Sequence, residues 1–255
     1  MGFHQAQTLD HALALAGQGA RILAGGTDLY PGTGARLTGP VVDIAGLSDL
    51  RGITRSQGLW IGACTPWTQI AEADLPPACA ALQQAARKVG GRQIQNAGTI
   101  GGNLCNASPA ADGVPPLLVL EAQVEIAGPQ GLRRLALADF LLAPRRVVLQ
   151  QGEILTAIHL PQAALSGRSA FEKLGARAYL VISIAMVAVR LETTADRITA
   201  AAVAVGACGP VARRLPAVEA ALCGLPEVIA AAVSGLAAPP SADRLIAHVV
   251  IRPGA

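Results

Sequence analysis

Apolar residues recur at helical spacing near the start of the chain, and short apolar runs of strand length follow them. The residues that share one helical face are Leu9, Ala12, Leu13 and Ala16. This spacing of three and four residues predicts a helix, which Thr8 can cap and Gly17 can end. Arg21–Ala24 and Val41–Ile44 then predict two short strands. The chain therefore begins with mixed helix and strand.

A second mixed unit follows the polar stretch Thr54–Gly58. Its predicted strands are Leu59–Ala63, Gln123–Ala127, Gly131–Leu135 and Leu155–Leu160. Gly128-Pro129 joins the second and third of these strands as a hairpin, and Pro161 ends the last. Its predicted helices are Trp67–Ala73, Cys79–Val89 and a short apolar helix that begins at Pro115-Pro116. We expect a domain boundary in residues 162–168.

Runs rich in Ala, Val and Ile predict a third unit. Its expected strands are Ser169–Leu174, Val181–Leu191 and Arg197–Ala207. Periodicity alone also allows Val181–Val189 to be a buried helix. Helical patterns at Ala217–Cys223 and Glu227–Ser234 follow, and then a short tail that ends in Leu245–Arg252. The pattern as a whole predicts an α+β fold.

Two glycine-rich segments about seventy residues apart carry the candidate chemistry. They are Ala24–Leu29, with the sequence AGGTDL, and Thr99–Leu104, with the sequence TIGGNL. Glycine lets a backbone turn tightly and come close to a bulky anion, and successive N–H groups form a concave site for phosphate oxygens. One such segment is usually a simple turn, but two predict a diphosphate held from both sides. No glycine segment has a P-loop or complete Rossmann pattern.

Composition excludes several classes of function. The net charge is only +3 and aromatic residues make up 3% of the chain, which argues against nucleic-acid binding. No signal peptide is evident and no apolar run is long enough to span a membrane, so we expect a cytoplasmic protein. Five cysteines without a Cys-x-x-Cys pair predict free thiols and no iron–sulfur cluster in this chain. Cys105 is expected near the cofactor, or else as a small buried apolar residue.

Residues 24–29 and 96–103 resemble the two signature loops of the FAD-binding medium subunits of molybdenum hydroxylases. That family includes the flavin subunits of xanthine dehydrogenases and aerobic carbon monoxide dehydrogenases. The resemblance extends, in the same order along the chain, to Pro109–Asp112, Gly152–Pro161 and Phe171–Ala185. It implies a two-subdomain FAD-binding fold of the vanillyl-alcohol-oxidase type, followed by a three-stranded antiparallel sheet with helices. The expected limits are 1–55 and 56–165 for the subdomains and 166–255 for the C-terminal domain.

The resemblance also implies a noncovalent FAD site. The residues that it assigns to the site are Ala24, Gly25, Gly26, Thr27, Asp28, Leu29, Thr99, Ile100, Gly101, Gly102, Asn103, Asp112, Leu155 and Tyr179. Both glycine segments would hold the pyrophosphate, and Asp112 the adenosine portion. Leu155 would reach the flavin through its backbone, and Tyr179 would lie over the isoalloxazine. Simpler readings are a turn residue for Asp28, a helix N-terminal residue for Asp112 and core packing for Tyr179.

The implied function is electron transfer. A partner subunit with two [2Fe–2S] clusters would deliver electrons to FAD, and a large subunit would carry the molybdenum cofactor, in a dimer of heterotrimers. No catalytic or metal-binding residues are expected in this chain. A free-standing FAD-dependent oxidoreductase and a flavin-free assembly subunit with a degenerate site stay open as alternatives. The tail is expected to depart from the family, whose members usually continue from the Pro-Pro region through a longer Arg- and Tyr-containing helix.

Overall fold

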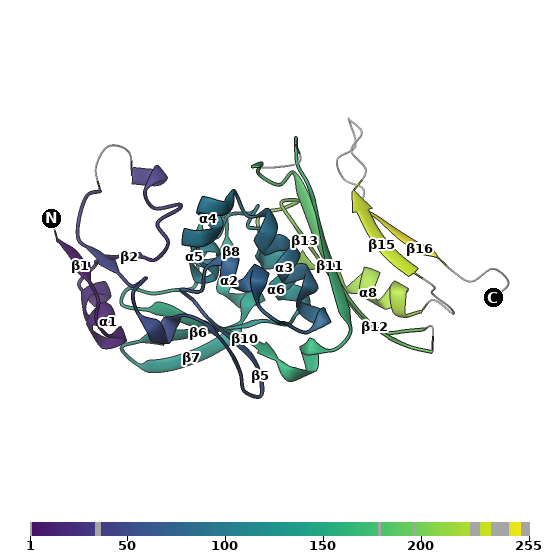
Figure 1. Cartoon of the computed structure of the whole chain (residues 1–255), viewed down its shortest axis with the longest axis horizontal. Coiled ribbons are helices and arrows are strands. Elements are labelled where there is room, and N and C mark those ends of the chain that lie inside the picture. The colour runs from purple at the N-terminus through teal and green to yellow at the C-terminus, as the bar shows by residue number, and fades with distance from the viewer. Residues whose placement is uncertain are drawn as a thin grey trace.

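The computed structural model describes residues 2–33, 37–177, 180–195 and 197–224, together with the backbone of two strands at 230–235 and 245–250. A small parallel sheet of order β1-β3-β2 opens the fold (Figure 1). Its elements are β1 (Phe3–Gln5), α1 (Leu9–Gly17), β2 (Arg21–Leu23) and β3 (Val41–Asp43). Thr8 Oγ1 accepts a hydrogen bond from His11 N at 3.2 Å, so the predicted helix cap is confirmed.

A five-stranded antiparallel sheet of order β4-β5-β10-β6-β7 forms the second unit. Its strands are β4 (Ile53–Arg55), β5 (Gly58–Gly62), β6 (Gln123–Gly128), β7 (Gly131–Ala136) and β10 (Ile154–Pro161). The predicted hairpin is confirmed by β6 and β7. A small hairpin of β8 (Leu141–Ala143) and β9 (Arg146–Val147) follows the short helix α7 (Leu137–Phe140).

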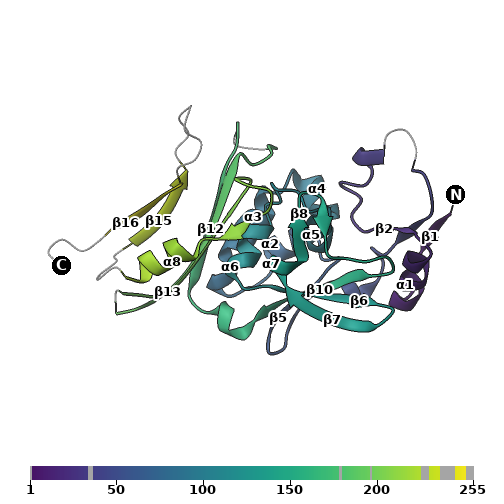
Figure 2. The same ribbon diagram turned by 180° about the vertical axis from the view of Figure 1, so that it is seen from behind.

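Five short helices form a layer between this sheet and the next, as both views show (Figures 1 and 2). They are α2 (Trp67–Glu72), α3 (Ala80–Lys88), α4 (Arg92–Ala97), α5 (Ile100–Asn106) and α6 (Val114–Val119). Helix α5 packs on β10, whereas α3 and α6 pack on the strands of the third unit. The largest buried core of the described residues lies in this layer around Trp67, Phe140 and Phe171.

The third unit is an antiparallel sheet of order β11-β12-β13-β14, against which α8 (Pro216–Cys223) packs. Its strands are β11 (Arg168–Leu174), β12 (Ala185–Thr194), β13 (Arg197–Gly206) and β14 (Arg213–Arg214). The sheet thus has one strand more than the three predicted. Strand β14 has only two residues, which is too short for an alternating pattern to reveal it.

Two predicted elements differ in the structure. The second strand begins at Ala185 and not at Val181, because pairing with β11 starts where Leu174 lies opposite Ala185. Its extended backbone also excludes the alternative of a buried helix over Val181–Val189. The helix predicted at Glu227–Ser234 is wrong for its second half, since Ala230–Gly235 forms β15 and pairs with β16 (Leu245–Val250). Residues 227–229 lie outside the described part. Alanine-rich runs suit both states, and the pairing decides between them.

The described sheets agree with a mixed helix-and-sheet fold, while the vanillyl-alcohol-oxidase type and the domain limits at 55 and 165 stay predictions. Strand β4, which ends at Arg55, already pairs with β5 in the second sheet. Among the helices of the described residues, none is both long and apolar enough to cross a membrane.

Candidate cofactor site

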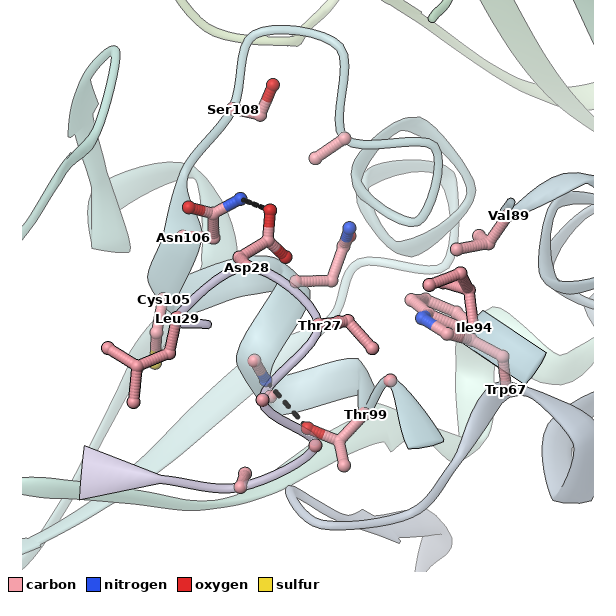
Figure 3. Close-up of a pocket in the computed structure, with 18 of the residues that line it drawn as sticks. Thr27, Asp28, Leu29, Trp67, Val89, Ile94, Thr99, Cys105, Asn106 and Ser108 are labelled. Atoms are coloured by element: carbon pink, nitrogen blue, oxygen red, sulfur yellow. Dashed lines mark hydrogen bonds between the residues drawn. The ribbon is translucent and has the colours of Figure 1, made fainter. Parts of the chain in front are cut away.

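A cavity of about 840 Å³ lies beside both glycine-rich segments. Its volume is near the upper end of the range of roughly 300–1,000 Å³ that is typical of small-molecule and cofactor sites. Figure 3 shows Asp28, Leu29 and Asn106 on one side of it, and Ile94 and Trp67 on the other. Of the predicted site residues, those that line the cavity are Ala24, Gly25, Gly26, Thr27, Asp28, Leu29, Thr99, Gly101, Gly102, Asn103, Asp112 and Leu155.

Of the other two predicted residues, Ile100 does not line the cavity in the described structure. Ile100 has a fully buried side chain in the main core, because it faces inward from the first turn of α5. Tyr179 lies outside the described residues. Its role over the isoalloxazine therefore stays a prediction.

The first glycine segment leaves its backbone donors available. Within the part of the chain that the structure describes, none of the N–H groups from Gly25 to Leu29 donates a hydrogen bond to a protein atom. Gly26 has a φ of +71°, a conformation that glycine adopts without strain. Buried or ligand-facing N–H groups need partners, so these adjacent donors are suited to an anion or to water.

The second glycine segment forms the start of helix α5 and not the loop that the sequence predicts. Thr99 caps α5, and its Oγ1 accepts from Gly102 N at 3.0 Å. Gly101 N donates to Ala63 O at 2.9 Å, and Ile100 N donates to Thr65 O at 3.1 Å. The N–H groups at the start of this helix are therefore already satisfied within the protein. The segment lines the cavity with small residues, which allow close approach, and not with free N–H groups.

The glycines also let each segment pack closely against neighbouring backbone. A Cβ on Gly25 would lie 2.0 Å from Ala97 O, and a Cβ on Gly101 would lie 2.7 Å from the Cβ and O atoms of Ala63. The close approach of these glycines to an anion predicts that a side chain at either position would occupy the space of a pyrophosphate. The structure shows instead that it would collide with neighbouring protein atoms, so these glycines shape the cavity wall through packing.

Asn103 carries an unusual buried atom. Its Oδ1 is buried and has no hydrogen-bond partner among the described residues, although Asn103 lines the cavity. An unsatisfied buried acceptor lowers the free energy of unfolding by about 1–3 kcal/mol. Such an atom beside a cavity is suited to a ligand that can donate a hydrogen bond or to an ordered water.

Asp112 is buried and held by two donors from the third unit. Lys173 Nζ lies 2.6 Å from Asp112 Oδ2, and Ser183 Oγ donates to Asp112 Oδ1 at 2.6 Å. Lys173 comes from β11, and its side chain is only 9% exposed. Asp112 is thus not the simple helix N-terminal surface residue of the alternative reading. Each carboxylate oxygen can accept a further hydrogen bond, so a ligand can still bind there.

Asp28 also has a protein partner, although it is exposed. Asn106 Nδ2 donates to Asp28 Oδ1 at 2.8 Å, and Arg145 Nη1 donates to Asn106 Oδ1. All three residues line the cavity. Asp28 could be predicted from the sequence, whereas Asn106, Arg145 and Lys173 could not, since no local motif marks them and only the fold brings them to this cavity.

The thiols near the cavity are unreactive in character. Cys105 lines the cavity as expected, and burial raises its pKa to about 12. Burial, with a smaller effect of the nearby Asp43, likewise raises the pKa of Cys64 to about 12. A thiol of this kind stays protonated at neutral pH and is a poor nucleophile and metal ligand. Within the described residues, no group of His, Cys, Asp and Glu side chains is placed to hold a metal ion.

Comparison with known proteins connects this geometry to a family. Residues 1–163 match the family model described as the FAD binding domain in molybdopterin dehydrogenase. The xanthine dehydrogenase FAD-binding subunit of Escherichia coli O157:H7 is 38% identical over 173 residues, which cover 62% of this chain and 57% of that protein. The nicotinate dehydrogenase FAD-subunit of Eubacterium barkeri is 37% identical, with 71% of this chain and 65% of that protein covered.

Solved structures show the same similarity. The carbon monoxide dehydrogenase of Hydrogenophaga pseudoflava, in a form that lacks the Mo-pyranopterin moiety of the molybdenum cofactor, contains a similar chain with 30% identity and a TM-score of 0.79. The match covers 88% of this chain and 80% of that one. The matched regions span less than two thirds of the two curated relatives named above.

Proposed function

Because this chain belongs to the family of FAD binding domains in molybdopterin dehydrogenases, we propose that it is the FAD-binding electron-transfer subunit of a molybdenum hydroxylase. The observation that carries the proposal is the first glycine segment. Its N–H groups from Gly25 to Leu29 have no protein acceptor among the described residues, and they belong to residues that line a cofactor-sized cavity.

The residues present fit FAD. In the proposed arrangement Ala24–Leu29 binds the pyrophosphate through its N–H groups, and Thr99–Asn103 lies against it through small residues. The unpartnered Oδ1 of Asn103 accepts a hydrogen bond from the cofactor. Asp112 binds the adenosine portion while Lys173 and Ser183 hold its carboxylate in place. Leu155 contacts the flavin portion, and Tyr179 is proposed to cover it.

FAD, when bound, supplies a redox group that can accept and pass on electrons. The protein's own part is to bind the cofactor and to set its surroundings. Carboxylates and cations are balanced around the cavity, with Asp28, Asp112 and Glu153 against Arg21, Arg145 and Lys173. This near-neutral lining, as far as the described residues form it, suits a bound group that the protein orients.

We propose that the electrons come from [2Fe–2S] clusters on a small partner subunit, and that a large partner subunit holds the molybdenum cofactor, in a dimer of heterotrimers. Three exposed apolar side chains, two of which line the cavity, support a partner surface beside it. Leu180, Ile182 and Ile184 are 61%, 79% and 54% exposed, and the first two line the cavity. Contiguous exposed apolar side chains often mark interaction sites.

Co-expression tests this function. The full chain is expected to co-purify with a cluster-bearing subunit and a molybdenum-bearing subunit, and the complex is expected to contain FAD. The isolated chain should not oxidise the substrate of the complex. Substrate-dependent loss of flavin absorbance in the isolated chain would favour a free-standing enzyme, and a complex without flavin would favour an assembly subunit.

A further inference from the structure

Three side chains from distant parts of the sequence meet at the rim of the cavity. Asp28 belongs to the first glycine segment, Asn106 ends α5, and Arg145 lies in the turn between β8 and β9. Asn106 Nδ2 donates to Asp28 Oδ1 at 2.8 Å, and Figure 3 shows the two side chains pointing toward one another. Arg145 Nη1 donates to Asn106 Oδ1 and, at 3.4 Å, to Asn106 O.

Because the Asn106 side-chain amide lies between Arg145 and Asp28, only one orientation of its oxygen and nitrogen is possible. A guanidinium can only donate hydrogen bonds and an ionised carboxylate can only accept them. Asn106 must therefore turn its oxygen to Arg145 and its nitrogen to Asp28. The amide connects a positive to a negative group, and the charge of Asp28, which would otherwise repel a phosphate, is compensated by the charge of Arg145.

The backbone around this contact is itself uncommon. Ala107 has a φ of 45° and Arg145 a φ of 59°, although non-glycine residues rarely adopt the left-handed region. Arg145 N donates to Ala107 O at 2.8 Å, so the two left-handed residues face each other across one hydrogen bond. Such conformations persist where the surrounding structure enforces them, and they cluster at binding sites. Here they bring the Arg145 guanidinium to Asn106.

We propose that Arg145, acting through Asn106, is a positioning residue that holds Asp28 and thereby keeps the N–H groups of Gly25–Leu29 available to the diphosphate of the cofactor. This inference rests on the proposed function for the identity of the ligand. Through Asn106, Arg145 holds the side chain of Asp28 in the first glycine segment. It thereby connects the β8–β9 turn to the cofactor site.

An exchange of the acid and the amide tests the arrangement. The variant Asn106→Asp still accepts from Arg145 but brings two carboxylates together, and its Kd for FAD is expected to rise about tenfold. Asp28→Asn combined with Asn106→Asp restores a donor at position 28 and leaves the net charge unchanged. This double variant should recover to within about threefold of the wild-type Kd.

Controls separate positioning from general loss of structure. Arg145→Ala should weaken FAD binding about tenfold, whereas Arg146→Ala removes the same charge from a neighbouring exposed residue and should leave the Kd unchanged. Each variant is compared with wild type by thermal unfolding without flavin. The inference would be overturned if the double variant bound FAD no more tightly than Asn106→Asp. Equal effects of Arg145→Ala and Arg146→Ala on the Kd would overturn it as well.

A readout without flavin keeps this inference separate from the proposed function. The N–H of Tyr30 donates to Gly26 O at 3.0 Å and closes the first glycine segment. Its amide hydrogen exchange in the flavin-free full chain should be faster in Arg145→Ala than in wild type and unchanged in Arg146→Ala. Unchanged exchange in Arg145→Ala would refute the positioning role, even if FAD binds. Failure of the wild-type chain to bind FAD, with the exchange difference present, would instead refute the proposed ligand.

Discussion

Lys173 Nζ lies 2.6 Å from Asp112 Oδ2, and both side chains are more than nine-tenths buried. The pair joins β11 of the third unit to the turn before α6 and forms part of the cavity wall. Ser183 Oγ holds the other oxygen of the same carboxylate. The buried carboxylate of Asp112 thus connects Lys173 of β11 and Ser183, which precedes β12, to the turn before α6.

Removal of the cation from this pair should destabilise the protein strongly. Lys173→Met leaves the Asp112 carboxylate buried without its counter-charge, and we expect the free energy of unfolding to fall by about 3 kcal/mol. Chemical denaturation measures the loss. Lys88→Met is the matched control, because Lys88 is 40% exposed where it pairs with Glu172 and should change stability by less than about 1 kcal/mol. Similar losses in both variants would contradict the role of burial.

Asn103 should show opposite effects on stability and on binding. Asn103→Leu removes the unpartnered Oδ1, so the flavin-free protein is expected to gain about 1 kcal/mol in free energy of unfolding. The same change should raise the Kd for FAD at least tenfold, because an acceptor is lost. Thermal unfolding and flavin titration measure the two effects. Asn96→Leu, at an exposed position, should alter neither. Unchanged FAD affinity in Asn103→Leu would show that Oδ1 does not face the cofactor.

Gly25→Ala should abolish tight FAD binding for a reason of packing. The new Cβ would lie 2.0 Å from Ala97 O, a separation that forces the first glycine segment away from the turn before α5. Gly17→Ala is the control, since a Cβ there meets no atom within 4 Å. Flavin titration and thermal unfolding of both variants test this account. Retention of wild-type affinity in Gly25→Ala would mean that the two segments can separate without harm to the site.

Glu153 should make stability depend on pH in the acid range. Arg133 donates two hydrogen bonds to its carboxylate, at 2.9 and 2.8 Å, and these lower the pKa of Glu153 below its ordinary value of 4.5. A pKa lowered by folding stabilises the protein above 4.5, and this stabilisation is lost as the pH falls through the lowered value.

The variant Glu153→Gln separates this effect from other acid groups. It should be less stable than wild type at pH 7, and the difference should shrink as the pH falls below 4.5. Denaturation in urea at a series of pH values gives the comparison. A difference that stays constant from pH 7 to pH 3 would contradict the assignment to Glu153.

Local signals in the sequence were enough for much of the fold and for one side of the site. Thr8 as a helix cap, the hairpin around Gly128-Pro129 and the first glycine segment were all visible, because each depends on residues close in the chain. The predictions for residues 181–184 and 230–234 are wrong, since apolar runs of that length suit helix, strand and loop alike until a partner strand selects one.

The rest of the site depends on contacts between distant residues. Lys173 lies 61 positions from Asp112, and Arg145 lies 39 positions from Asn106, so no spacing rule connects them. The change of the second glycine segment from a loop to the first turn of α5 has a similar origin. Its N–H groups find acceptors in Thr65 and Ala63, which the sequence alone does not place nearby.

Flavin content of the purified full chain tests the central claim most directly. The chain, alone or with its partner subunits, is titrated with FAD, and bound flavin is then measured after acid precipitation. We predict saturation at one FAD for each chain and complete release into the acid supernatant, since no covalent link is expected. The absence of bound flavin from both the chain and its complex would contradict the account.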